Sequence, residues 1–256
     1  MSRIFSLDNP VVVVLTKIFD VIWLSLLYSV FVIPELFGIF MAARDGWNVL
    51  SIILCLPALG FGAATTALYY VSAKVIRKSQ SYVWREFKKS FLLNFRQSTI
   101  YWVVVLCIYF LLAWNVNYLG LNNPNSANFG GYLPAIYMTM IILMVAVTLN
   151  VFPIISRFDN KLMTSVKFAL YCCFRHFLHT LVIFLLVSMG IYVVYMTYDF
   201  AITVNAPILL AFTIFLPGLI CWLITFPMEH VLKKYQPKNE DKVDSEGHTI
   251  KMWYEE

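Results

Sequence analysis

Long apolar stretches separated by short polar segments follow one another along the chain. The six stretches cover residues 11–33, 47–73, 99–117, 133–155, 178–198 and 207–227. Because about 20 consecutive apolar residues cross a bilayer as a helix, the pattern predicts six membrane-spanning helices. Pro34 and Glu35 are expected to end the first, and the long second one is expected to bend or break between Pro57 and Gly62. We expect an all-α polytopic helix bundle over residues 1–235, with five spans if the first two stretches are misread.

Composition agrees with this interpretation and excludes a soluble protein. Hydrophobic residues make up 61% of the 256 residues and charged residues only 13%, whereas an ordinary soluble domain has about 25% charged residues. Residues 236–256 are polar, with nearly balanced acids and bases, and contain too few apolar residues to form a core. We therefore expect a mobile tail there.

Basic residues are concentrated in alternate connecting segments between the predicted spans. Segment 74–96 holds seven Lys and Arg residues against the single acid Glu86, segment 157–179 holds four against Asp159, and loop 115–132 has no charge. Basic loops stay on the cytoplasmic side of a membrane. The sequence therefore predicts a multi-pass protein of the cell membrane with both termini in the cytoplasm. No nucleic-acid partner is expected.

The segment between the second and third spans has the pattern of an amphipathic helix. At 100° per residue, four aromatic residues fall within roughly 80° of arc, and four basic residues occupy the adjoining arc. These residues are Trp84, Phe87, Phe91 and Phe95, and Arg85, Lys88, Lys89 and Arg96. Such a helix suits the membrane surface, where its bases reach acidic lipid headgroups. The same face could dock a protein partner, and both interpretations remain open.

A weaker copy of this basic segment lies 79 residues further along, at 161–177. Lys88, Phe95 and Arg96 match Lys167, Phe174 and Arg175. The copy predicts a parallel internal repeat in which a span, a cytoplasmic helix and another span are used twice. Lys167 and Arg175 therefore join the candidate contacts to lipid or a partner.

Charged residues are scarce inside the predicted spans. The charged residues that lie well inside a predicted span are Lys17 and Asp20, three residues apart in the first span. We expect them to form an ion pair near the cytoplasmic end of that span. Asp199 and Glu229 lie at span ends, where we expect them to reach water. Ion-coupled carriers usually place charged groups within the bundle. A proton- or sodium-driven mechanism is therefore disfavoured, although facilitated diffusion of a neutral solute remains open.

The sequence has no motif for ATP hydrolysis or hydrolytic catalysis. It lacks a G-x-x-x-x-G-K-[ST] phosphate loop, an H-E-x-x-H motif and a Gly-x-Ser-x-Gly elbow. His176 and His179 lie close in sequence to Cys172 and Cys173. One interpretation of these four residues is a soft metal site. Histidine is also common where a segment enters the membrane, and we favour that interpretation. We expect no enzyme activity, no cofactor and no metal.

Several motifs of this chain resemble a known family. The most specific is Gly-Ala-Ala-Thr-Thr-Ala-Leu-Tyr-Tyr-Val at 62–71. The others lie at 5–8, 87–91, 94–97, 152–158 and 174–176. Over most of residues 1–200 the chain is similar to the YesL-like family of bacterial membrane proteins. It departs from the family pattern in the additional apolar segment between Pro34 and Pro57.

The resemblance implies an association with carbohydrate ABC importers and with glycan-degrading enzymes. It therefore favours an accessory membrane subunit of an ABC-type sugar importer, with membrane lipids and the importer's permease and ATPase subunits as partners and a carbohydrate as the substrate carried. The alternative is a stand-alone carrier for a neutral solute, whose binding site would form at the bend between Pro57 and Gly62.

Overall fold

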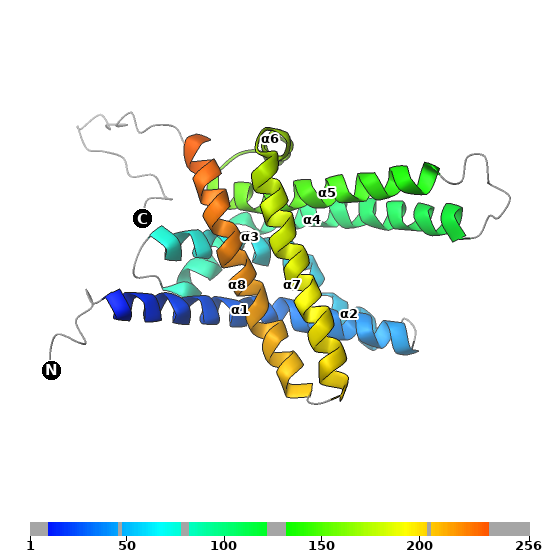
Figure 1. The fold of residues 1–256 in the computed structure, drawn as a ribbon, viewed down its shortest axis with the longest axis horizontal. Helices are drawn as coiled ribbons and strands as arrows, with labels where there is room; N and C mark the ends of the chain where they lie inside the picture. The colour runs from blue at the N-terminus through cyan, green and yellow to red at the C-terminus, as the bar shows by residue number, and fades with distance from the viewer. Residues whose placement is uncertain (1–9, 46–47, 78–81, 122–131, 204–205, 236–256) are drawn as a thin grey trace.

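The computed structural model describes residues 10–45, 48–77, 82–121, 132–203 and 206–235. In this part of the chain every regular element is a helix, which confirms the predicted all-α fold (Figure 1). The helices are α1 (Pro10–Asp45), α2 (Val49–Cys55), α3 (Ala58–Arg77), α4 (Val83–Leu121), α5 (Tyr132–Arg157), α6 (Leu162–Arg175), α7 (Phe177–Thr203) and α8 (Ala206–Leu232), followed by a 3₁₀ turn at Lys233–Tyr235. The tail predicted at 236–256 lies outside the described residues.

The helices have the length and composition of membrane spans. Five segments among the described residues are long and apolar enough to cross a bilayer, and a sixth is added if the bent pair α6–α7 counts as one span. The protein is therefore a multi-pass helical membrane protein, in agreement with the predicted five or six spans. The break expected in the second apolar stretch is also present, because α2 ends at Cys55 and α3 begins at Ala58, after Pro57.

The first helix is longer than predicted. We expected Pro34 and Glu35 to end it, but α1 continues through Pro34 to Asp45. A proline removes one backbone hydrogen bond and tends to kink a helix, yet prolines are tolerated in membrane helices, where neighbouring groups satisfy the freed backbone atoms. The apolar span itself ends at Glu35, as predicted, whereas the expectation that the helix ends there was wrong.

The predicted surface helix and the third span form one continuous helix. We expected a separate element at 82–97, but α4 runs unbroken from Val83 to Leu121. No glycine or proline interrupts it before Gly120. Its 39 residues extend for about 58 Å, well beyond the roughly 30 Å hydrocarbon core. The basic part of α4 is thus an extension of a span rather than a helix lying by itself along the lipid.

The second basic segment does form a separate helix. The helices α6 and α7 are bent by 97° relative to each other, and the break lies at His176, whose φ of −113° and ψ of 45° are not helical. The two halves of the predicted repeat therefore differ in shape. The first basic segment continues straight into its span, whereas the second turns sharply before its span begins.

Two helical hairpins dominate the arrangement. The helices α4 and α5 lie side by side, and the α7–α8 hairpin crosses α1 (Figure 1). Small residues permit the closest approaches. A Cβ atom at Gly62 of α3 would lie 2.6 Å from the carbonyl oxygen of Ser98 in α4, and one at Gly218 of α8 would overlap the Ser25 side chain of α1. These contacts hold the helices around a common interior.

Candidate functional site

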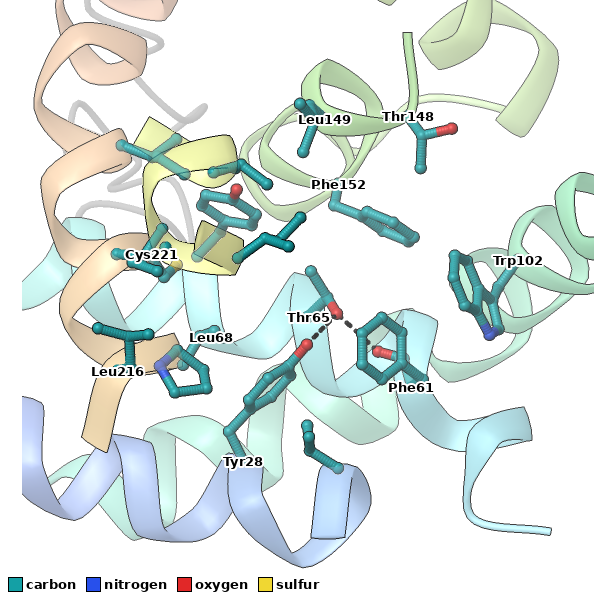
Figure 2. A pocket seen from close by; sticks show the side chains of 18 residues that line it. Tyr28, Phe61, Thr65, Leu68, Trp102, Thr148, Leu149, Phe152, Leu216 and Cys221 are labelled. Atoms are coloured by element: carbon teal, nitrogen blue, oxygen red, sulfur yellow. Dashed lines mark hydrogen bonds between the residues drawn. The ribbon is translucent and has the colours of Figure 1, made fainter. Parts of the chain in front are cut away.

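A central cavity of about 470 Å³ lies where the α7–α8 hairpin meets the other helices (Figure 2). Helices α1, α3, α4, α5, α7 and α8 all contribute to its wall. The lining residues are Tyr28, Val32, Phe61, Thr65, Leu68, Tyr69, Trp102, Thr148, Leu149, Phe152, Val187, Gly190, Ile191, Leu216, Pro217, Ile220, Cys221 and Ile224. None of these residues, all within the described part of the chain, carries a charge. The cavity has the size of a small-molecule site.

Aromatic rings form one wall of the cavity. The ring centroids of Phe61 and Trp102 are 4.9 Å apart, and those of Tyr28 and Phe61 are 5.6 Å apart. Phe152 continues this wall, with its centroid 6.2 Å from that of Trp102. Phe61 comes from the segment between Pro57 and Gly62, so the predicted bend does contribute one side chain to the cavity.

The hydroxyl groups beside this wall are engaged with the protein itself. Thr65 donates to the carbonyl of Phe61 at 2.8 Å and lies 3.1 Å from the Tyr28 hydroxyl, so the tyrosine is the donor in their pair (Figure 2). The indole N–H of Trp102 is buried and has no hydrogen-bond partner among the described residues. A ligand of this cavity would therefore meet mostly apolar surface. An uncharged molecule, apolar over most of its surface, fits these walls.

Charged side chains gather at a different place, the ends of α3, α5 and α8. One carboxylate oxygen of Glu229 lies 3.0 Å from Nε of Arg77 and 3.1 Å from Nη2 of Arg157. One turn before Arg77, the Nζ of Lys74 lies 2.8 Å from a carboxylate oxygen of Glu86 in α4. We call these five residues the ion cluster. It ties four helices together at what we call the basic end of the bundle.

The sequence did not predict the ion cluster. We expected Glu229 to reach water at the end of its span, but its side chain is only 16% exposed and is held between two arginines. One signal was present in the sequence. Both α3 and α5 end on an arginine, Arg77 and Arg157, and an acid in the last part of α8 is the natural partner for two such cations.

The predicted contact face of α4 is divided by the packing. Trp84 and Phe95 are exposed, as are the basic residues Arg85, Lys88, Lys89 and Arg96. Phe87, in contrast, is only 5% exposed, and Phe91 is half-buried with its ring centroid 5.3 Å from that of Phe31. Phe87 and Phe91 therefore contact the core of this chain instead of a free surface. For the exposed residues, the role as contacts to lipid or a partner stays a prediction.

Two of these exposed residues meet α1. Trp84 and Arg85 line an open surface depression of about 520 Å³ together with Asp20 and Trp23 of α1. Lys17 lies almost one turn before Asp20 on the same helix. The ion pair between Lys17 and Asp20 stays a prediction. The structure adds that Asp20 belongs to the same depression as a basic residue of α4.

Helix α6 presents a second exposed basic face. Lys167 and Arg175 are exposed, and the Arg175 guanidinium lies 5.8 Å from the centroid of the Tyr171 ring. Met163 and Phe174 are 67% and 66% exposed. These apolar and basic side chains lie uncovered by the rest of the described chain, and their role as contacts to lipid or a partner stays a prediction.

The histidines near the α6–α7 break interact with one another and with a tyrosine. His176 Nε2 lies 2.9 Å from the Tyr235 hydroxyl, and the parallel rings of His179 and His230 have centroids 6.1 Å apart. Within the described residues, no group of three or more His, Cys, Asp or Glu side chains is placed to hold a metal ion. The contacts observed are those of side chains that join α6, α7 and the end of α8.

Comparison with known proteins agrees with part of the resemblance. Residues 21–116 match the model of a family described as a protein of unknown function, DUF624. This is the family to which YesL belongs. The match runs from α1 through most of α4 and covers less than half of the chain. No curated protein and no solved structure is significantly similar to this chain.

Proposed function

We propose that this chain is an accessory integral-membrane subunit of an ABC-type carbohydrate importer. Its partners would be the permease and ATPase subunits, which supply the energy for transport. One observation carries the proposal. The central cavity has no charged side chain in its described lining, so it lacks the ionisable groups that ion-coupled carriers usually place within the bundle. A chain that takes part in uptake without such groups needs energy from a neighbour.

The exposed faces of α4 and α6 support this proposal, because they offer a contact surface at the basic end. Trp84 is 59% and Phe95 42% exposed, and Lys88 and Lys89 lie between them on the outside of α4. Aromatic residues and arginine are enriched in protein interfaces, and the exposed Arg85 and Arg96 belong to the same face. If the basic end faces the cytoplasm, as the distribution of Lys and Arg indicates, this surface lies on the side where an ATPase would act.

Affinity purification in mild detergent at native expression levels tests the proposal. We expect permease and ATPase subunits to be recovered with the tagged chain, and their absence would contradict it. The double substitution Lys88→Glu and Lys89→Glu should weaken the association, because it reverses two exposed charges. The matched control is Lys233→Glu with Lys234→Glu, an exposed lysine pair at the same end of the bundle. If the Lys88 and Lys89 substitutions leave the complex unchanged, the α4 surface is not the contact; if the control pair weakens it equally, the effect is not specific to α4.

The central cavity favours a second candidate function, a stand-alone carrier for a neutral solute. Its volume of about 470 Å³ and its aromatic wall suit an uncharged molecule. Downhill flux of a neutral solute into vesicles that contain this protein alone would support this candidate. Gly190→Leu would place a larger side chain in the cavity wall, against Ile220, and should reduce such flux. Absence of flux in the unmodified protein would reject the candidate.

A further inference from the structure

A second, much smaller cavity lies beside the ion cluster. It has a volume of about 20 Å³ and is lined by Tyr70, Ala73, Lys74, Arg77, Ser156 and Arg157. This is room for one group of about the size of a water molecule or a single oxygen atom. Three of the six lining side chains are cations, and no acid is among them. Glu86 and Glu229 contact these cations without lining the cavity.

Arg157 has hydrogen-bond donors that nothing in the described chain satisfies. Its side chain is only 6% exposed, and its Nη2 is paired with Glu229. Its Nε and Nη1 atoms are buried without a partner. Buried polar groups are almost always hydrogen-bonded, and a buried cation needs acceptors in particular. The Arg157 side chain also lines the cavity, which makes the cavity the candidate place for the missing acceptor.

The charges around the cavity do not balance. Lys74, Arg77 and Arg157 contribute three positive charges, and Glu86 and Glu229 contribute two negative charges. A water molecule could accept from Arg157, but it would leave the excess charge in place. An anionic oxygen satisfies the free donors and the charge together.

The position of the cavity indicates where such an anion comes from. Arg77 and Arg157 are the last residues of the spans formed by α3 and α5, which is the depth at which lipid headgroups lie. The Arg77 side chain is 34% exposed and that of Lys74 is 15% exposed, so the site is reached from the surface of the bundle. Basic pockets between membrane helices are known to bind phosphate headgroups.

We propose that Lys74, Arg77 and Arg157 form a binding site for a phosphate group, which inserts one oxygen into the small cavity and is supplied by the headgroup of an anionic lipid. The remaining phosphate oxygens and the lipid chains lie outside the cavity, since the space inside admits a single atom. This site is separate from the exposed α4 face and does not depend on the proposed function.

Native mass spectrometry of the full chain, purified in detergent and stripped of lipid, tests the site. The probes are phosphatidylglycerol, diacylglycerol with the same acyl chains, and inorganic phosphate. We expect one phosphatidylglycerol molecule to bind at least about tenfold more tightly than diacylglycerol, because only the former carries phosphate. Arg157→Gln should lower this affinity about tenfold or more. Lys234→Gln, which removes an exposed cation at the same end of the bundle that does not line the cavity, should leave it unchanged.

The possible results distinguish a lipid headgroup from free phosphate as the ligand, and some of them would reject the phosphate site. If millimolar inorganic phosphate does not displace phosphatidylglycerol, the lipid is the ligand; if it does, free phosphate occupies the same site. Arg77→Gln provides a second variant if Arg157→Gln does not fold, since Arg77 is partly exposed. Equal binding of phosphatidylglycerol and diacylglycerol, or an affinity unaffected by the arginine substitutions, would overturn the proposal and leave water as the occupant of the cavity.

Discussion

Replacing Glu229 with glutamine is expected to destabilise the bundle strongly. One oxygen of Glu229 is the acceptor for both Arg77 and Arg157, at 3.0 and 3.1 Å. Glutamine keeps the size of the side chain and one acceptor oxygen but removes the negative charge. The net charge of the ion cluster then rises from one to two. Arg157 cannot turn toward water, because it is only 6% exposed.

The size of the effect follows from the burial of the two arginines. Removing one partner of a buried ion pair costs roughly 3–5 kcal/mol, because the other charge stays buried without compensation. Arg77 contributes little to this cost, since a third of its side chain already reaches the surface. The retained amide oxygen offsets part of the loss at Arg157. We therefore expect the free energy of unfolding to fall by about 3 kcal/mol, which lowers the Tm by roughly 6–12 °C for a chain of this length.

Thermal unfolding in detergent, followed by tryptophan fluorescence, measures this change. Asp159→Asn is the matched control because it removes an exposed carboxylate two residues after Arg157, and we expect a change below about 0.5 kcal/mol. Adding Arg157→Gln to Glu229→Gln should restore part of the stability, since it removes the uncompensated buried charge. A Tm of Glu229→Gln within 2 °C of the unmodified protein, or a further loss in the double variant, would refute the reasoning.

Other substitutions test the packing. Phe87→Ala should cost about 3 kcal/mol because it empties a core position, whereas Trp84→Ala should stay within about 0.5 kcal/mol; equal losses in thermal unfolding would contradict the division of the α4 aromatic face. Gly218→Leu should prevent the close crossing of α8 and α1 and yield aggregated protein in size-exclusion chromatography, and a monodisperse, fully stable variant would show that the helices can separate at little cost. Thr65→Val should remove the acceptor of the Tyr28 hydroxyl and lower the stability by about 1 kcal/mol, and an unchanged Tm would mean that this hydrogen bond contributes nothing measurable.

Hydrophobic patterning predicted where helices lie better than where they end. The all-α fold, the break at Pro57 and the separate basic helix before α7 all follow from the sequence. The end of α1 was missed, because a proline inside a membrane helix is compatible with continued helix on both sides. The continuity of α4 was missed because a change from polar to apolar composition does not interrupt backbone hydrogen bonding.

The candidate sites depend on contacts between helices, which the sequence alone does not reveal. Helical periodicity placed Phe87 and Phe91 on the same face as Trp84, but only tertiary packing determines that α1 covers part of that face. The ion cluster joins residues from four helices and required their relative positions. The central cavity likewise arises from the crossing of six helices. Its lack of charged lining, in contrast, agrees with the scarcity of charged residues already evident in the sequence.

The most direct test of the central claim is solute uptake into proteoliposomes that contain this chain alone. The claim is that the chain cannot couple ion movement to transport, because its central cavity offers no charged group. With a proton or sodium gradient imposed and radiolabelled neutral sugars outside, we predict no accumulation above the external concentration. Accumulation that depends on the ion gradient and requires this chain would contradict the claim.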